Sequence, residues 1–257
     1  IAMGYVDFSK VQHLILDEAD RMLDMGFLDD IMQVVNLLPQ KGRQTLLFSA
    51  TMPPKIRQLA KNILHNPKEV SLAISKPAEG IKQGAYCVYD TQKLPLIKHI
   101  LTPYAEGSVI IFSSKKTNVK EIARELQRLH FNVGVIHSDL EQKDRESVLR
   151  DFKDHNINIL VATDIIARGI DIEKIDLVIN YDVPRDAEDY VHRIGRTARA
   201  NNEGCAYTFI NEKEMNAFAA IERLIEMEIT KETLPEELGN GPEYKPTKQR
   251  HHHKGNF

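Results

Sequence analysis

Tryptophan is absent from the 257 residues of the chain, and cysteine occurs only twice, as Cys87 and Cys205. Two cysteines so far apart match neither a disulfide framework nor the closely spaced ligands of a zinc site. The sequence also lacks an apolar run near the ~18 residues of a membrane-spanning helix, and its first residues lack the pattern of a secretory signal. We therefore expect a reduced, cytoplasmic protein with no membrane partner.

A marked excess of charge is missing as well. Lysine and arginine number 34 and aspartate and glutamate 37, which gives a formal net charge of −3. Bulk charge therefore does not indicate a nucleic-acid partner, and any anion-binding surface must be local. With 42% hydrophobic and 28% charged residues, the composition is that of a globular protein of one large or two medium domains.

Short apolar runs alternate with helical patterns along the chain. The runs are almost continuously apolar, as strands buried on both faces of a parallel sheet are. Between them, Val119, Ile122 and Leu126 recur at helical spacing with charges on the opposite side. This alternation predicts a doubly wound α/β fold. We expect strands at 13–16, 45–48, 109–112, 132–136, 157–162, 176–180 and 205–210, and helices at 116–130, 141–153, 186–198 and 211–229.

A stretch that contains proline and glycine, residues 71–95, interrupts the alternation and indicates an interdomain linker. The part before it has too few strands to close a sheet, whereas the part after it is more complete. Beyond Leu238 the composition turns to glycine, proline and basic residues, which is typical of a disordered tail. The expected divisions are a partial first domain at 1–75, a linker with the first strand of the next domain at 76–95, a second domain at 84–230 and a basic tail at 231–257.

Acidic residues follow the first predicted strand directly. The segment "LILDEAD" ends in Asp17, Glu18 and Asp20. At the carboxyl end of a parallel strand, one carboxylate can hold Mg²⁺ through water and a neighbour can activate water for phosphoryl transfer. A solvated turn with acidic caps explains the same letters. The segment "LLFSAT" repeats the pattern with Ser49 and Thr51, which could also serve only as turn residues.

Two later segments carry groups that suit a phosphate backbone. After one predicted strand, Thr163 supplies a hydroxyl and Gly169 permits close approach of the main chain. Gln142 and Arg145 begin a predicted helix, and a helix N-terminus beside an arginine can bind phosphate. A tight turn with a salt-bridged arginine explains the first pattern, and a solvated helix face explains the second.

Arginines recur at every third position in the segment "YVHRIGRTAR". Arg193, Arg196 and Arg199 would lie on one side of a helix. Three neighbouring guanidinium groups repel one another unless an anion or an acid lies among them. A nucleotide phosphate would fill this role, and a structural ladder of ion pairs is the alternative.

The order of the segments is more specific than any one of them. DEAD, SAT, IFSSKK, QKDR, ATDIIARGID and HRIGRTAR follow one another from Asp17 to Arg199. This order resembles the DEAD-box ATP-dependent RNA helicases of superfamily 2, over almost the whole chain to about residue 230. The short basic tail is similar to that of bacterial RhlE-type members. The resemblance implies RecA-like doubly wound parallel sheets, one partial and N-terminal and one complete, with ATP between the two domains and RNA across both.

The resemblance also implies roles for individual residues. Asp17 would be the carboxylate associated with Mg²⁺ through water, and Glu18 the base that orients or activates water. Arg196 and Arg199 would be arginine fingers on the γ-phosphate, and Asp171 would contact the ribose. The residues implied in coupling between the domains are Asp20, Ser49, Thr51, His192 and Arg193. The residues implied in binding the RNA backbone are Ser113, Ser114, Gln142, Arg145, Thr163 and Gly169.

Two departures from the family pattern affect the expected activity. Ala198 stands where the family usually has glycine, and no G-x-x-x-x-G-K-[ST] phosphate loop occurs in the sequence. The resemblance therefore implies the C-terminal portion of a helicase, with the phosphate loop located before Ile1, and we expect the chain alone to be inactive as an ATPase. A stand-alone RNA-binding module without ATPase activity is the alternative function, and a DNA helicase is a third.

Overall fold

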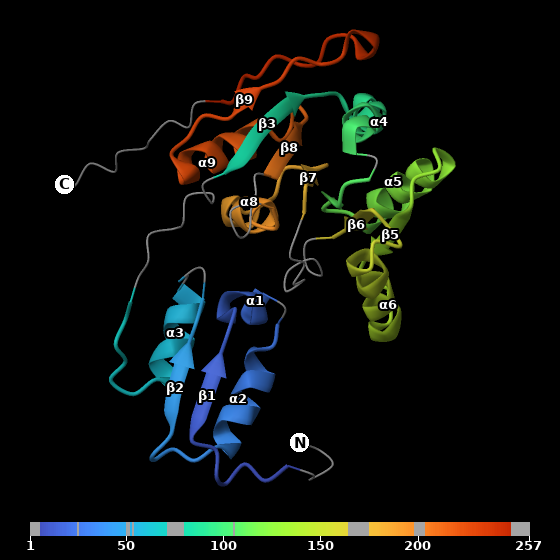
Figure 1. Ribbon diagram of the computed structural model, residues 1–257. Helices are drawn as coiled ribbons and strands as arrows, with labels where there is room; N and C mark the ends of the chain where they lie inside the picture. The colour runs from blue at the N-terminus through green and yellow to red at the C-terminus, as the bar shows by residue number, and fades with distance from the viewer. Residues whose placement is uncertain are drawn as a thin grey trace, which may run out of the picture. The chain divides into compact units, whose positions relative to one another are not determined.

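The computed structural model contains two compact units, Ile1–Ile74 and Ser75–Phe257. The residues that it describes are 6–24, 26–49, 52, 54–70, 80–104, 106–163, 175–197 and 204–247. In both units the strands are parallel and helices pack against them (Figure 1). The predicted α/β class, with one small and one large parallel sheet, is confirmed.

In the described part of the first unit, two strands pair in parallel, with Ile15 opposite Leu46. Its elements are β1 (His13–Leu16), α1 (Ala19–Asp24), α2 (Leu28–Leu37), β2 (Gln44–Leu47) and α3 (Pro54–Ile63). Leu16 packs with Val35 of α2 and Leu59 of α3, whereas Ile15 points to the other face and is 59% exposed. Among the described residues of this unit, α2 and α3 both pack on the face of Leu16. The exposed Ile15 agrees with the expectation that the part of the chain before the linker is too small to bury both faces of a sheet.

The described residues of the second unit form a sheet of seven parallel strands in the order β5-β6-β4-β7-β8-β3-β9. The strands are β3 (Ile81–Cys87), β4 (Val109–Phe112), β5 (Val133–Ile136), β6 (Ile159–Ala162), β7 (Leu177–Asn180), β8 (Gly204–Ile210) and β9 (Thr230–Lys231). Their register aligns the last residues of the four neighbouring strands β5, β6, β4 and β7. The loops that follow these strands therefore begin side by side at the carboxyl edge of the sheet, where ligands of such sheets bind.

Helices cover both faces of this sheet. One core contains Phe152 of α6, Tyr190 of α8 and Phe218 of α9, and the other contains Leu96 of α4 and Val119 of α5. Successive strand residues alternate between the two cores, which explains the continuous apolar runs. The helices are α4 (Lys93–Leu101), α5 (Lys116–Arg128), α6 (Gln142–Lys153), α8 (Ala187–Ile194) and α9 (Met215–Ile225), and the short 3₁₀ turns are η1 (Asp90–Gln92), η2 (Thr102–Tyr104) and η3 (Glu236–Leu238).

The stretch predicted as a linker contributes more structure than expected. Residues 81–87 form β3 between β8 and β9, and α4 begins at Lys93 (Figure 1). Gly84, interpreted from the sequence as a linker residue, lies inside β3. A Cβ atom at Gly84 would lie 2.9 Å from ring atoms of Tyr207 and from the Glu232 carboxylate. This glycine therefore permits close packing within the sheet.

The segment after α9 is also ordered further than predicted. Lys231 forms an ion pair with Glu222, and the Tyr244 hydroxyl donates to the same carboxyl group at 2.8 Å. Gln92 Nε2 donates to the Leu238 carbonyl at 2.8 Å. These contacts hold the segment up to residue 247 against the second unit, so the expectation of disorder from residue 231 onward is wrong for 231–247. The remainder of the predicted tail, 248–257, lies outside the described residues.

Candidate active site and nucleic-acid interface

The acids of the DEAD segment lie in the turn between β1 and α1. Glu18 has a φ of 50°, in the left-handed region that residues with a side chain seldom adopt. Its backbone N–H donates to Asp17 Oδ1 at 2.9 Å, and its carboxylate pairs with Arg21 Nη1 at 2.7 Å. Both acids are exposed. A strained backbone that presents an acid to solvent at the end of a strand is characteristic of functional sites.

Ser49 connects the end of β2 to the same turn. Its Oγ accepts the backbone N–H of Asp20 at 3.2 Å, and the Ala19 N–H donates to the Phe48 carbonyl at 3.0 Å. The DEAD and SAT segments, which are far apart in the sequence, are therefore hydrogen-bonded to each other. Thr51 lies outside the described residues.

Asp17 was predicted to hold Mg²⁺ through water, and its side chain is exposed at the end of β1. Within the described ranges, no group of three or more His, Cys, Asp or Glu side chains could enclose a metal ion. Mg²⁺ retains several waters and usually takes one or two carboxylates together with substrate phosphates. The exposed Asp17 beside Glu18 fits such a partial site.

Three of the predicted RNA-binding residues lie at the carboxyl edge of the large sheet. Ser113 and Ser114 follow β4, and Thr163 follows β6, the neighbouring strand. The Ser113 N–H donates to the Ala162 carbonyl at 3.0 Å, and the Thr163 N–H donates to the Ile136 carbonyl at 3.2 Å. The register of the strands therefore brings these residues together.

The two serines of this loop differ in exposure. Ser114 is exposed, whereas Ser113 is fully buried, and its hydroxyl donates to Asp182 Oδ2 at 2.5 Å. The Ser113 hydroxyl is therefore already used inside the protein. Of the two, Ser114 has the side chain that an external ligand can reach.

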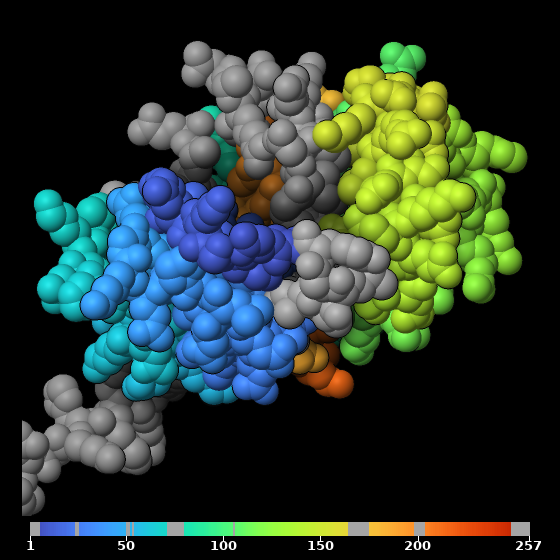
Figure 2. All heavy atoms as spheres, turned by 90° about the horizontal axis from the view of Figure 1, so that it is seen from below, coloured from blue at the N-terminus to red at the C-terminus, as the bar shows by residue number. Residues whose placement is uncertain are grey.

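Gln142 and Arg145 lie in the first turns of α6, as predicted from the sequence. Gln142 Nε2 donates to Glu146 Oε1 at 2.8 Å, and the Arg145 N–H donates to the Glu141 carbonyl at 3.0 Å. Helix α6 packs against β5 and follows its carboxyl end. Figure 2 shows atoms of α6 (yellow) and α5 (yellow-green) side by side on the surface of this unit.

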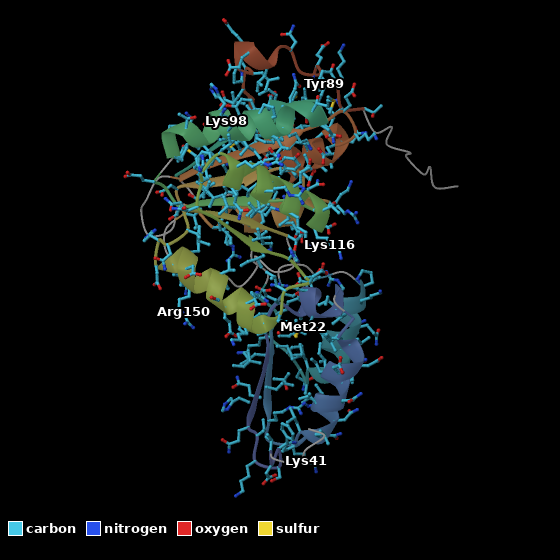
Figure 3. The ribbon with its side chains drawn as sticks, turned by 90° about the vertical axis from the view of Figure 1, so that its right-hand side faces the viewer. Met22, Lys41, Tyr89, Lys98, Lys116 and Arg150 are labelled. Carbon is cyan, nitrogen blue, oxygen red and sulfur yellow. The ribbon has the colours of Figure 1, made fainter. Side chains whose placement is uncertain are left out.

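The start of α5 adds basic residues that the sequence analysis did not single out. Lys116, labelled in Figure 3, and Lys120 contact the Asp139 carboxylate at 3.1 and 3.7 Å. The hydrogen bond from Lys116 is the main reason that the pKa of Asp139 lies below its usual value. The two lysines following Ser114 in "IFSSKK" were the available signal, because basic residues after a strand end can meet a phosphate backbone.

The arginines of α8 do not form one row. Arg193 is 3% exposed, and its Nη1 donates to Asn180 Oδ1 at 3.1 Å and to the Asp182 carbonyl at 3.0 Å. Arg196 lies beyond the end of α8 at Ile194, in a turn where its Nε donates to the His192 carbonyl at 3.3 Å. The expectation that these two arginines share one helix side is therefore wrong. The buried position of Arg193 favours a structural role within the second unit.

Several other predicted residues fall outside the part of the chain that the structure describes. They are the predicted γ-phosphate, ribose and RNA contacts Arg199, Asp171 and Gly169.

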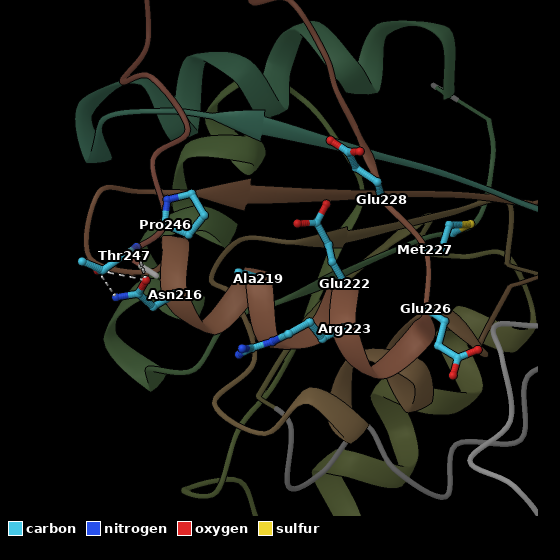
Figure 4. Close-up of a pocket in the computed structure, with 9 residues that line it drawn as sticks. All are labelled: Asn216, Ala219, Glu222, Arg223, Glu226, Met227, Glu228, Pro246 and Thr247. Atoms are coloured by element: carbon cyan, nitrogen blue, oxygen red, sulfur yellow. Dashed lines mark hydrogen bonds between the residues drawn. The ribbon is translucent and has the colours of Figure 1, made fainter. Parts of the chain in front are cut away.

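A surface cavity of about 420 Å³ lies elsewhere on the second unit, between α9 and the segment that follows it (Figure 4). Its lining includes the carboxylates of Glu222, Glu226 and Glu228 and one basic side chain, Arg223. None of the predicted site residues that the structure describes lines it, and its acidic wall is unsuited to phosphate. Within the described residues, no helix is both long and apolar enough to cross a bilayer.

Comparisons with known proteins agree with this arrangement of motifs. Residues 2–59 match the "DEAD/DEAH box helicase" family, and residues 92–201 match the "Helicase conserved C-terminal domain". One matching solved structure is the crystal structure of the E. coli DEAD-box protein SrmB bound to regulator of ribonuclease activity A. The two sequences are 30% identical, and the structures superpose with a TM-score of 0.58. The match covers 63% of this chain and 96% of that chain. This chain belongs to the DEAD-box helicase family.

Other DEAD-box proteins match over more of this chain. The ATP-dependent RNA helicase CshA of Listeria monocytogenes is 44% identical over 213 residues, which is 82% of this chain and 41% of that protein. The structure of S. cerevisiae Dbp5 bound to RNA and ADP BeF3 has a TM-score of 0.81 at 31% identity and covers 90% of this chain and 62% of that chain. The DEAD-box chain thus spans about two-fifths of the length of the Listeria relative. The RhlE subtype stays a prediction.

Proposed function

We propose that this chain is part of an ATP-dependent RNA helicase that couples ATP hydrolysis to RNA binding and local duplex separation. The observation that carries the proposal is the hydrogen-bonded pair of strand ends in the first unit, with Glu18 exposed in a left-handed conformation and Asp20 joined to Ser49. Relatives named as ATP-dependent RNA helicases and the RNA and nucleotide in the Dbp5 structure support the same activity. In this proposal, residues 1–75 belong to the first RecA-like domain, 76–95 contain the linker and the first strand of the second domain, and 84–230 form the second domain.

Hydrolysis would use groups from both units. Mg²⁺, when bound with ATP, would neutralise charge on the phosphates. Asp17 would hold a water of the ion, and Glu18 would orient the attacking water and take its proton. Arg196 and Arg199 would face the γ-phosphate, and Asp171 the ribose. An arginine that stabilises the transition state in this way is worth roughly 10³–10⁵ in rate.

RNA would lie along the carboxyl edge of the large sheet. Ser114, Thr163 and the first turns of α6 with Gln142 and Arg145 offer hydroxyl, amide and guanidinium donors there, and Gly169 would allow close approach of the backbone. Such contacts carry little sequence preference. They give a salt dependence with a slope of about −0.7 for each phosphate neutralised on a single strand.

We further propose that the chain as written binds RNA but does not hydrolyse ATP. The sequence contains no G-x-x-x-x-G-K-[ST] loop to cradle the phosphates. This observation also favours the second candidate, an RNA-binding module without catalysis. The two candidates differ in whether hydrolysis appears once a phosphate loop is supplied.

The experiment measures phosphate release from ATP, with and without single-stranded RNA, by the chain and by a chimera that carries a Walker A half-domain in front of residue 1. We expect no turnover by the chain and RNA-stimulated turnover by the chimera, which Arg196→Ala abolishes with RNA affinity largely kept. RNA-stimulated turnover by the chain alone, abolished by Glu18→Gln, would contradict the argument from the phosphate loop. A well-folded chimera that binds RNA without turnover would favour the RNA-binding module.

A further inference from the structure

Asp182 occupies a central place at the carboxyl edge of the large sheet, and no role was predicted for it from the sequence. It follows β7 by two residues, just as Ser114 follows β4, the neighbouring strand. Asp182 Oδ2 accepts the Ser113 hydroxyl at 2.5 Å and the Ser114 backbone N–H at 3.0 Å. One carboxylate oxygen therefore fixes both residues of the loop that begins where β4 ends.

The other oxygen of Asp182 faces a buried cation. Lys93 Nζ lies 3.5 Å from Asp182 Oδ1, 3.5 Å from Glu214 Oε2 and 3.4 Å from Asp90 Oδ1. Lys93 is 1% exposed, and its Nζ lies 5.0 Å from the centre of the Tyr181 ring. The carboxyl ends of β3, β7 and β8 are thereby connected through one ammonium group, and its charge compensates that of Asp182.

The main chain at Asp182 is held as firmly as the side chain. The Asp182 carbonyl accepts Arg193 Nη1 at 3.0 Å, and the same nitrogen donates to Asn180 Oδ1 at 3.1 Å. Asn180 Nδ2 in turn donates to Thr208 Oγ1 at 3.0 Å. Asp182 is therefore preorganised before it contacts the loop, which means that it imposes its geometry on Ser113 and Ser114.

We propose that Asp182, anchored by Lys93, is a positioning residue that holds the Ser113–Ser114 loop in the conformation that binds an RNA backbone. The buried Ser113 hydroxyl serves as an internal anchor, and its partner Asp182 turns Ser114 and the two lysines after it toward solvent. This role rests on the proposed RNA binding at this edge of the sheet. It does not require Asp182 to touch RNA, since its two oxygens are engaged by groups of its own chain.

A matched control lies at the amino ends of the same strands. Asp176 precedes β7 and accepts the Ser108 backbone N–H through Oδ2 at 2.8 Å, and Ser108 precedes β4. Asp176 and Asp182 therefore make the same type of bond between the same two strands, at the amino and the carboxyl end respectively. A purely structural role would make the two aspartates equivalent, whereas a positioning role for RNA would distinguish them.

The experiment compares the 257-residue chain with its Asp182→Asn and Asp176→Asn variants. Binding of a fluorescently labelled single-stranded RNA is measured by anisotropy at low salt, and urea unfolding is measured in parallel. We expect both variants to lose stability. Only Asp182→Asn should bind RNA more weakly, by about twofold to tenfold. In this variant the Ser113–Ser114 loop must become ordered when RNA binds, and the free energy that this ordering requires lowers the affinity.

A second readout follows the loop without RNA. The Ser114 amide proton donates to a carboxylate, so its NMR signal should move upfield in Asp182→Asn and stay in place in Asp176→Asn. If Asp182→Asn does not fold, Ser113→Ala removes the internal anchor alone, and it should move the same signal and weaken RNA binding about twofold.

The outcomes separate failure of the proposed RNA binding from failure of the positioning role. If the unsubstituted chain binds no RNA, the proposed function of this edge and the positioning role both fall. If that chain binds RNA and the two aspartate variants bind equally well, only the positioning role is overturned. An unmoved Ser114 signal in both Asp182→Asn and Ser113→Ala would also overturn it.

Discussion

Replacing Lys93 with methionine removes the cation that joins three strand ends of the large sheet. Methionine keeps an unbranched apolar stem of similar length, so packing changes little. The carboxylates of Asp90, Asp182 and Glu214 lose the ammonium group that now lies 3.4–3.5 Å from each. The substitution therefore tests the electrostatic contribution of Lys93 rather than its volume.

The magnitude follows from how much water reaches each carboxylate. Breaking a buried ion pair by removing one partner costs about 3–5 kcal/mol. The Asp90 side chain is 77% exposed and contributes little, whereas those of Asp182 and Glu214 are 14% and 20% exposed. We expect a loss of about 3 kcal/mol, at the lower end of that range. With a urea slope of about 2 kcal/mol/M, the unfolding midpoint should fall by roughly 1.5 M.

Tyrosine fluorescence follows this change in the second unit selectively. The chain has no tryptophan and eight tyrosines, and only Tyr5 precedes residue 75, which leaves seven in the second unit. A urea titration followed by tyrosine emission therefore reports chiefly on the unit that contains Lys93. Far-UV circular dichroism in the same titration shows whether the two units unfold together.

Lys116→Met is the matched control, because Lys116 also pairs with an aspartate but at the surface, where the two side chains are 55% and 45% exposed. Its loss should stay below about 1 kcal/mol. In the Lys93→Met background, Glu214→Gln should restore part of the lost stability, because it removes an uncompensated charge. Equal, small losses for both lysine variants would refute the idea that Lys93 balances buried carboxylates.

Two further predictions concern the packing and the titration of the second unit. Gly84→Ala should destabilise the second unit by about 1–3 kcal/mol, because the added Cβ atom would lie 2.9 Å from the Tyr207 ring. An unchanged free energy of unfolding in a urea titration would contradict the close packing at this position. Burial holds the pKa of Glu214 above its ordinary value of 4.5, against the opposing effect of Lys93. The folded state therefore binds this proton more tightly than the unfolded state does. The natural chain should therefore lose stability, relative to the Glu214→Gln variant, as the pH rises from about 4.5 through the higher pKa of the folded state. Urea titrations at several pH values measure this difference. A free energy of unfolding that rises with pH over this range, relative to the variant, would exclude the burial effect.

The central strands of the large sheet could be predicted because their residues are buried on both faces. Val109 and Ile111 face one core and Ile110 and Phe112 the other, so the sequence is apolar without interruption. Strand β3 shows why the remainder could not be predicted. Its segment "IKQGAYC" contains Lys82 and Gly84, which resemble linker residues when the partner strands are unknown. Tertiary packing against Tyr207 overrides the local preference.

The site residues divide in the same way. The positions of Asp17, Glu18 and Ser49 after strand ends could be predicted because acids or hydroxyls follow apolar runs directly, and the hydrogen bond between Asp20 and Ser49 joins the two strand ends. Their roles in catalysis and coupling stay predictions. The buried role of Ser113 was not predictable, because its partner Asp182 lies 69 positions away in the sequence. Exposure and long-range hydrogen bonds decide such roles, and neither can be deduced from residue spacing.

Asp17 and Asp182 both follow a parallel strand, and their surroundings give them different chemistry. Asp17 is exposed and accepts the N–H of the next residue, so its carboxylate can still meet water or an ion. Asp182 accepts two donors on one oxygen and faces Lys93 with the other. An aspartate whose oxygens are engaged in this way has few lone pairs left for an external ligand. In the proposed function, Asp182 would therefore act on RNA only through the loop that it holds, whereas Asp17 would act directly on an ion bound with the nucleotide.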